Sequence, residues 1–287
     1  MEQNALVVDG LTKQYRDFTL DHISFCVPRG SIVGLIGENG AGKSTAIQAI
    51  LGLIQKDAGS ISLLGKTEEE MDAATRNRIG VVFDGSNFPG ALSPDKLNTV
   101  FQRIYETWDE DVYFSLLEQL SLPKEKKFKE FSKGMRMKLS IAVALSHHSE
   151  FLILDEATSG LDPVVRDDIL DIFLDFVQDE NHSILVSSHI TSDLEKVADY
   201  IVFLHEGKII FSKSKDELIY RYGIIKCGAA QFAAIDQQDI VAWRKQDYEW
   251  DILVADRDAA GKKYPKTIID PATIDDIMLF YGKGERP

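Results

Sequence analysis

The segment GLIGENGAGKST, residues 34–45, restricts the possible folds more than any other part of the chain. It matches the pattern G-x-x-x-x-G-K-[ST] through Gly37, Gly42, Lys43 and Ser44, with an apolar strand signal before it and a helical pattern after it. Glycines let backbone N–H groups surround a phosphate, the lysine adds a positive charge, and the serine hydroxyl can complete the ligand shell of Mg²⁺. The residues expected to bind nucleotide in this loop are Gly37, Asn39, Gly40, Ala41, Gly42, Lys43, Ser44 and Thr45.

A second motif, FLILDE at residues 151–156, combines a buried strand with two carboxylates at its carboxyl end. We expect Asp155 to hold Mg²⁺ through water and Glu156 to orient or deprotonate the attacking water. An acidic strand end that faces solvent would be an equally good reading of the motif alone. The phosphate loop upstream favours the catalytic reading.

Short β-branched runs alternate with helical patterns from Leu6 to about Tyr222, which predicts an α/β fold with a P-loop core. The expected strands are residues 6–8, 18–27, 31–37, 59–64, 79–83, 151–155, 183–188 and 200–205. Several are apolar throughout, as in strands that are covered on both faces, whereas residues 5–27 predict an antiparallel subdomain. Ser192 and Glu195 have the spacing of a helix capping box.

The expected organisation is one large nucleotide-binding domain over residues 1–222 and a small α+β appendix over residues 223–287. A helical subdomain is inserted at about residues 85–150, where strand signals are missing between residues 92 and 150. In the appendix we expect a short helix near 237–245, an alternating strand at 248–257, a loop with Gly261, and a last helix at 273–282. The appendix either lengthens or regulates a dimer contact, or it stabilises the fold.

The net charge of −14 argues against nucleic acid as a partner, because a globally acidic surface opposes phosphate neutralisation. No apolar run reaches the roughly 18 to 20 residues that a membrane span requires. The amino end has no secretion-signal pattern, and the two cysteines, Cys26 and Cys227, lie far apart, so a reducing cytoplasm is expected.

Four short motifs follow the phosphate loop in a fixed order: FSKGM at 131–135, FLILDE at 151–156, SGLD at 159–162 and SSH at 187–189. Together they closely resemble the nucleotide-binding subunit of ABC transporters over residues 5–222. The resemblance implies two subunits packed head to tail with two ATP molecules between them. Ser132 and the N–H groups of Lys133 and Gly134 would then bind the ATP of the opposite subunit, at the start of a helix.

The same resemblance gives roles to further residues. Tyr15 would stack on adenine, although a tyrosine in the core or on the surface remains an open reading. His189 would hydrogen-bond the γ-phosphate, and residues 159–162 would cross the dimer interface. The cofactors that the resemblance implies are ATP and Mg²⁺, with Ser44, Asp84 and Asp155 as ligands of the metal.

The chain departs from the family pattern at two places. Lys133 replaces the first glycine of the usual Leu-Ser-Gly-Gly-Gln signature, where its side chain either adds charge toward phosphate or lies solvated on the surface. Asp84 stands where the family has a glutamine after the strand at 79–83, and we expect it still to serve the metal.

The resulting hypothesis is an Mg²⁺-dependent ATPase subunit that drives an exporter through a separate integral membrane subunit. It would act as a homodimer or heterodimer, bound peripherally at the cytoplasmic face of the membrane, with a docking surface between Asp84 and about Leu120. The Ser-Lys-Gly-Met form resembles exporters for peptides, toxins or drugs of Gram-positive bacteria.

Two alternatives use the same phosphate chemistry. A non-transport ABC ATPase of the ribosome or chromosome would ordinarily have two cassettes with a basic linker, or a long coiled coil, and the chain has neither pattern. A P-loop kinase would have no use for FSKGM or for His189.

Overall fold

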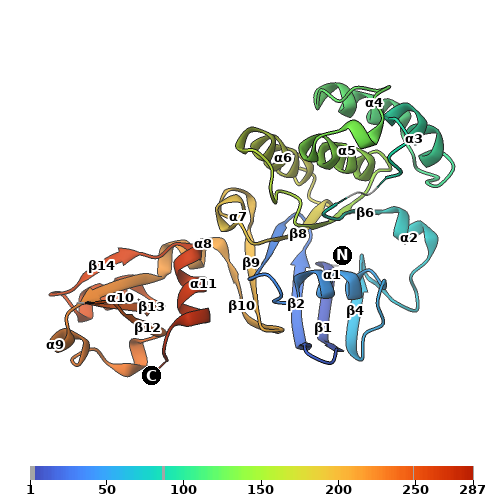
Figure 1. The fold of residues 1–287 in the computed structure, drawn as a ribbon. Coiled ribbons are helices and arrows are strands. Elements are labelled where there is room, and N and C mark those ends of the chain that lie inside the picture. The colour runs from blue at the N-terminus through green and yellow to red at the C-terminus, as the bar shows by residue number, and fades with distance from the viewer. Residues whose placement is uncertain (1–3, 86–87, 248, 287) are drawn as a thin grey trace.

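The computed structural model describes residues 4–85, 88–247 and 249–286, and within these ranges the strands form three sheets (Figure 1). The predicted α/β class with an antiparallel subdomain is confirmed. The first sheet has the order β2-β1-β4-β5, the second β10-β9-β3-β8-β7-β6, and the third β12-β13-β11-β14.

The second sheet forms the centre of the molecule. Its strands are β3 (Ile32–Ile36), β6 (Ile79–Val82), β7 (Phe151–Asp155), β8 (Ser183–Ser188), β9 (Tyr200–His205) and β10 (Lys208–Ser214). All neighbours are parallel except β10, which pairs antiparallel with β9. Every residue of β3, β7 and β8 is buried, because helices or the first sheet cover both faces, as their apolar sequences predict. Because β3, β7 and β8 are parallel, their carboxyl ends meet at one edge of the sheet.

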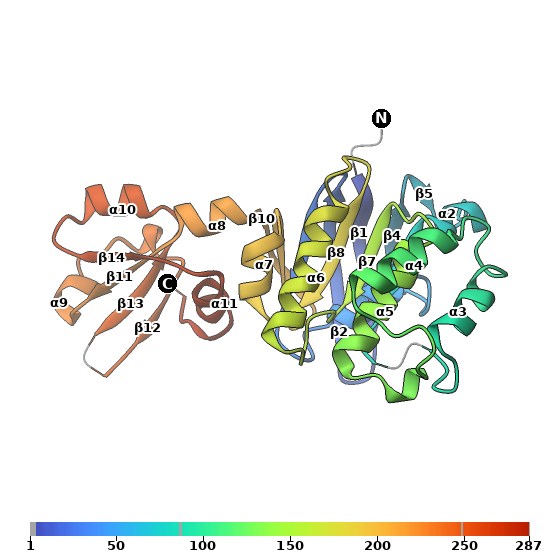
Figure 2. The ribbon, with the colours of Figure 1, turned by 90° about the horizontal axis from the view of Figure 1, so that it is seen from above.

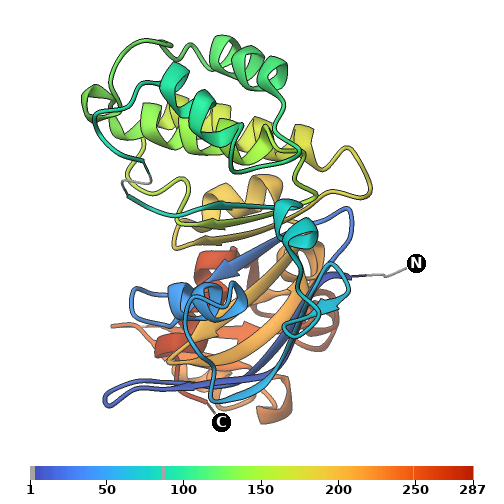
Figure 3. The ribbon, with the colours of Figure 1, turned by 90° about the vertical axis from the view of Figure 1, so that its right-hand side faces the viewer.

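The first sheet packs against the second and shares a core with the helix after the phosphate loop. Its strands are β1 (Asn4–Gln14), β2 (Thr19–Pro28), β4 (Ala58–Leu63) and β5 (Lys66–Thr67), and the helix is α1 (Lys43–Ile50). Along β2 buried residues alternate with less buried ones, since only one face of this sheet meets the core. Figure 3 shows β1 and β2 below α1 and the central strands.

The helices of the inserted segment lie together beyond the edge strand β6, at the top of Figure 3. They are α3 (Pro94–Phe101), α4 (Glu110–Gln119), the 3-10 turn η1 (Phe128–Glu130) and α5 (Lys133–Leu145), whereas the short helix α2 (Ala73–Asn77) precedes β6 and lies apart from them. Their starts follow the sequence signals: Pro94 opens α3, and the side chains of Asp109 and Ser132 accept backbone N–H groups at the starts of α4 and α5. Helices α6 (Pro163–Phe176), α7 (Thr191–Val197) and α8 (Lys215–Arg221) follow later strands.

The C-terminal segment contains the third sheet and three helices. Its elements are β11 (Gly223–Cys227), α9 (Ala229–Phe232), the 3-10 turn η2 (Gln237–Asp239), β12 (Ala242–Lys245), β13 (Trp250–Val254), α10 (Arg257–Lys263), β14 (Ile268–Pro271) and α11 (Ile274–Lys283). The helix expected at 237–245 is wrong, because only a 3-10 turn forms before β12 pairs with β13 and Trp243 packs on Trp250. Gly261 lies inside α10 and not in a loop. Tyr248, which opens the expected strand at 248–257, lies outside the described residues.

The last helix, α11, joins the third sheet to the centre of the molecule (Figure 2). Tyr281 packs against Phe211 of β10 with ring centroids 5.5 Å apart, and Ile274, Ile277 and Phe280 belong to the same buried cluster as the central strands. The predicted capping box is wrong, because α7 begins at Thr191. The Glu195 carboxylate instead accepts the N–H of Ile274, the first residue of α11, at 3.1 Å. The predicted domain boundary at residue 222 stays a prediction.

Among the described residues, none of the helices combines the length and the apolar character that crossing a bilayer requires.

Candidate active site

The phosphate loop connects β3 to α1 at the carboxyl edge of the central sheet. Gly42 has φ +110°, and a β-carbon there would lie 2.6 Å from the ring of Phe18. Gly37 has no such backbone strain, but a β-carbon on it would lie 2.3 Å from the Leu204 carbonyl oxygen. Both positions therefore require glycine, one for its conformation and one for its size.

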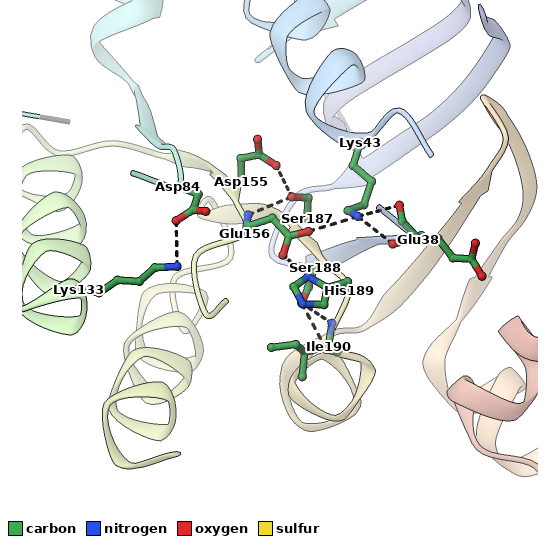
Figure 4. Close-up of polar contacts among 11 residues, drawn as sticks. Glu38, Lys43, Asp84, Lys133, Asp155, Glu156, Ser187, Ser188, His189 and Ile190 are labelled. Atoms are coloured by element: carbon green, nitrogen blue, oxygen red, sulfur yellow. Dashed lines mark hydrogen bonds and ion pairs between the residues drawn. The ribbon is translucent and has the colours of Figure 1, made fainter. Parts of the chain in front are cut away.

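The Lys43 side chain is 6% exposed and folds back over the loop. Its ammonium donates to the carbonyl oxygens of Gly37 at 2.8 Å and Glu38 at 3.3 Å. The same nitrogen lies 3.2 Å from Oε1 of Glu156, as Figure 4 shows. The lysine of the first predicted motif and the glutamate of the second thus form an ion pair.

Glu156 follows β7 directly and has φ +55°, in the left-handed region that a glutamate adopts only at a cost. Its N–H donates to Oγ of Ser187, at 3.1 Å, on the neighbouring strand β8. Its second carboxylate oxygen lies 2.6 Å from Nδ1 of His189. This backbone turn aims the carboxylate between Lys43, the first residue of α1, and His189, which follows β8 (Figure 4).

Ser187 also holds Asp155. The Ser187 hydroxyl donates to Oδ1 of the buried Asp155 at 2.5 Å, so one serine fixes both residues of the acidic pair. The sequence contained this serine within SSH, but nothing in the spacing assigned it a role, because the contact depends on β7 and β8 being neighbours in register.

A cavity of about 410 Å³ opens where these groups meet. Its lining consists of Phe18, Glu38, Asn39, Gly40, Gly42, Lys43, Ser44, Thr45, Asp84, Glu156, Ser159 and His189. Half of the residues expected to bind nucleotide or metal thus line one cavity, whereas Gly37, Ala41 and Asp155 are buried and do not line it. Tyr15 is 48% exposed and is not part of this lining, which contains Phe18 as its aromatic residue. The adenine-stacking role of Tyr15 stays a prediction.

The signature segment, FSKGM at residues 131–135, is not part of the lining of this cavity. Ser132 caps α5 by accepting the Met135 N–H at 3.2 Å, and Gly134 is buried against Val165. The Lys133 side chain lies at the surface, 47% exposed, and its ammonium lies 3.2 Å from Oδ1 of Asp84 in the same chain (Figure 4).

The donor set around the cavity fits Mg²⁺ held together with a nucleotide. Hydroxyl and carboxylate oxygens, from Ser44, Asp84 and Asp155, are the ligands that this hard cation prefers. Within the described part of the chain, no three His, Cys, Asp or Glu side chains gather into a metal site of their own.

Comparison with known proteins supports one family. The family described as ABC transporter matches residues 20–159. The bacitracin transport ATP-binding protein BcrA of Bacillus licheniformis is 32% identical over 242 residues, which are 83% of this chain and 78% of that protein. The lantibiotic transport ATP-binding protein SrtF of Streptococcus pyogenes is 35% identical, over 74% of this chain and 91% of its own. A solved ATP-binding subunit of an ABC transporter superposes with a TM-score of 0.65 at 28% identity, covering 75% of this chain and 91% of the other.

Proposed function

Because the chain belongs to the ABC transporter family, as an ATP-binding subunit in which ATP hydrolysis is coupled to transport, we propose that it powers the export of a peptide antibiotic. The substrate class is proposed from relatives named for bacitracin and lantibiotic transport. The membrane path would belong to a separate subunit, which would hold this chain at the cytoplasmic face of the membrane.

The observation that carries the proposed mechanism is the chain of contacts from Lys43 through Glu156 to His189. Phosphates that enter the cavity would take the Lys43 ammonium from Glu156, because they offer it a higher negative charge. The freed carboxylate would then accept a proton from the attacking water. His189, whose Nδ1 lies 2.6 Å from this carboxylate, would hold the carboxylate in its orientation. Bound Mg²⁺ would supply charge neutralisation on the phosphates, with Ser44, Asp84 and Asp155 as its protein ligands.

Each cavity would be completed by a second subunit. Ser132 and the first N–H groups of α5 do not line the cavity of their own chain, although a helix start of this kind suits an anion. A head-to-tail pair would bring this helix start to the γ-phosphate held by the other copy. Since this chain carries Ser132, Glu156 and His189 together, a homodimer would have two complete sites.

A second, largely apolar groove supports docking of the membrane subunit. It has a volume of about 590 Å³, and its lining includes Leu53, Met71, Val81, Phe83 and Tyr105. Leu53 in this lining is 61% exposed, so its side chain is accessible to a partner that enters the groove. We propose that one helix of the membrane subunit lies in this groove, where Phe83 precedes Asp84 of the phosphate cavity. The docking range expected from the sequence was Asp84 to about Leu120. Among the described residues of that range, the groove lining includes only Tyr105.

The relatives do not favour a ribosomal or chromosomal role, because they are named for transport. To test the proposal, the chain is isolated from its native membranes in mild detergent, and bound proteins are identified by mass spectrometry. A stoichiometric partner with several membrane spans supports it. Recovery with ribosomes or chromosomes, and without such a partner, would refute the transport role of this chain.

A further inference from the structure

Two of the residues that depart from the family pattern, Asp84 and Lys133, contact each other. Asp84 follows β6 after one intervening residue, Lys133 is the first residue of α5, and Nζ of the lysine lies 3.2 Å from Oδ1 of the aspartate. Both side chains are 47% exposed, so the pair lies at the surface and not in the core. It joins the edge of the central sheet to the helix of the signature segment.

The two partners have different positions relative to the phosphate cavity. Asp84 belongs to its lining and Lys133 does not. The lysine that does line the cavity, Lys43, is already engaged by Glu156. The Lys133 ammonium also lies over Gly160, where an added β-carbon would come within 3.1 Å of it. The ammonium therefore lies beside the SGLD segment as well as beside Asp84.

We propose that Lys133 is a positioning residue that holds the Asp84 carboxylate on the α5 side of the cavity and neutralises its charge until nucleotide binds with its metal. The inference rests on the proposed function of the cavity as the ATP site. It gives the lysine a role in its own subunit, distinct from the contact of its backbone N–H with the opposite ATP.

The physical reason is the charge that an aspartate brings to a phosphate site. An unpaired carboxylate beside a triphosphate repels it, whereas a neutral glutamine would not. The Lys133 ammonium cancels this repulsion in its resting position. When the nucleotide carries Mg²⁺, the cation attracts the carboxylate, so the ion pair is no longer needed to prevent repulsion.

A double-mutant cycle on nucleotide binding tests the inference. The probe is β,γ-imido-ATP, which is not hydrolysed, titrated calorimetrically into the full chain in EDTA and again in Mg²⁺. The variants are K133M, D84N and the double variant, with K133R as the conservative replacement. K138M is the matched control, because Lys138 is on the same helix but pairs with Asp168. Thermal unfolding of each variant checks that the fold is retained.

With Asp84 present, K133M is expected to weaken binding in EDTA about fivefold, the effect of roughly one unscreened charge at contact distance in water. The loss should shrink in Mg²⁺, disappear in the D84N background, and be restored by K133R, while K138M has no effect. An equal loss with and without Asp84, or no loss with Asp84 present, overturns the inference alone. Failure of the unmodified chain to bind the probe at all overturns the proposed function together with it.

Discussion

The carboxylate of Glu156 lies 2.6 Å from Nδ1 of His189, although the two residues come from the ends of different strands. The register of β7 against β8 and the left-handed backbone of Glu156 create this contact. The orientation of the carboxylate is thus a property of the central sheet, and residues that fix the sheet edge should affect turnover.

Replacement of His189 by alanine removes the group that orients Glu156. We expect turnover to fall about 100-fold, at the lower end of general acid–base contributions, because the carboxylate keeps its charge but loses its direction. Binding of β,γ-imido-ATP should change little. Single-turnover hydrolysis and calorimetric binding measure the two effects separately, and an unchanged rate would remove His189 from the mechanism.

Replacement of Ser187 by alanine deletes a hydroxyl that is donor to Asp155 and acceptor for the Glu156 N–H. Asp155 is buried and loses a hydrogen bond, so we expect the free energy of unfolding to fall by about 1–3 kcal/mol. Turnover should fall as well, since the strained turn at Glu156 loses an anchor. Urea unfolding measures the loss of stability, and ATPase rates measure the loss of turnover. Replacement of Ser149, a buried serine elsewhere, by alanine is the control for stability.

Leu53 at the edge of the apolar groove should be needed for docking and not for folding. A change of Leu53 to glutamate places a charge where the helix of the membrane subunit is proposed to lie. The variant should lose co-purification with that subunit while its ATPase rate alone is retained. Ile268, which is 68% exposed in the third sheet, is the matched position, and its change to glutamate should leave the complex intact. Equal losses from both changes would argue against the groove.

His147 predicts a pH dependence of stability. Burial lowers the pKa of its ring, which stacks on Tyr105 with centroids 4.1 Å apart and donates from Nδ1 to the Asn77 carbonyl. The unfolded chain therefore binds a proton more readily than the folded one, so stability is present above the ordinary histidine pKa and is lost as pH falls through the lowered value. When the pH is lowered from 7.5 to 5.5, the free energy of unfolding in urea should fall less for the H147Q variant than for the unmodified chain. An identical pH dependence of the free energy of unfolding in the two proteins would contradict the assignment of this effect to His147.

The parts of the site that the sequence predicted are local in the chain. The phosphate loop, FLILDE and the cap at Ser132 each combine residue types whose chemistry follows from a few neighbouring positions. The elements around them were predictable for the same reason, because buried strands such as β7 and capped helices such as α5 carry their own patterns.

The parts that the sequence did not predict depend on contacts between distant segments. β12 forms because Trp243 finds Trp250 and the register of β13, whereas its local pattern had indicated a helix. Glu195 caps α11 in place of its own helix, since the C-terminal segment returns to α7. The pairing of Lys133 with Asp84 likewise required the fold to bring α5 beside the end of β6.

The measurement that most directly tests the central claim is sedimentation of the E156Q variant with Mg²⁺ and ATP. This change keeps the size of the side chain but removes the base, so hydrolysis should slow by about 10² to 10⁴-fold while ATP remains bound between two subunits. We predict a stable dimer that forms only with ATP and dissociates with ADP. A monomer under all conditions, or hydrolysis at the unmodified rate, would contradict the account of Glu156 at a site shared by two subunits.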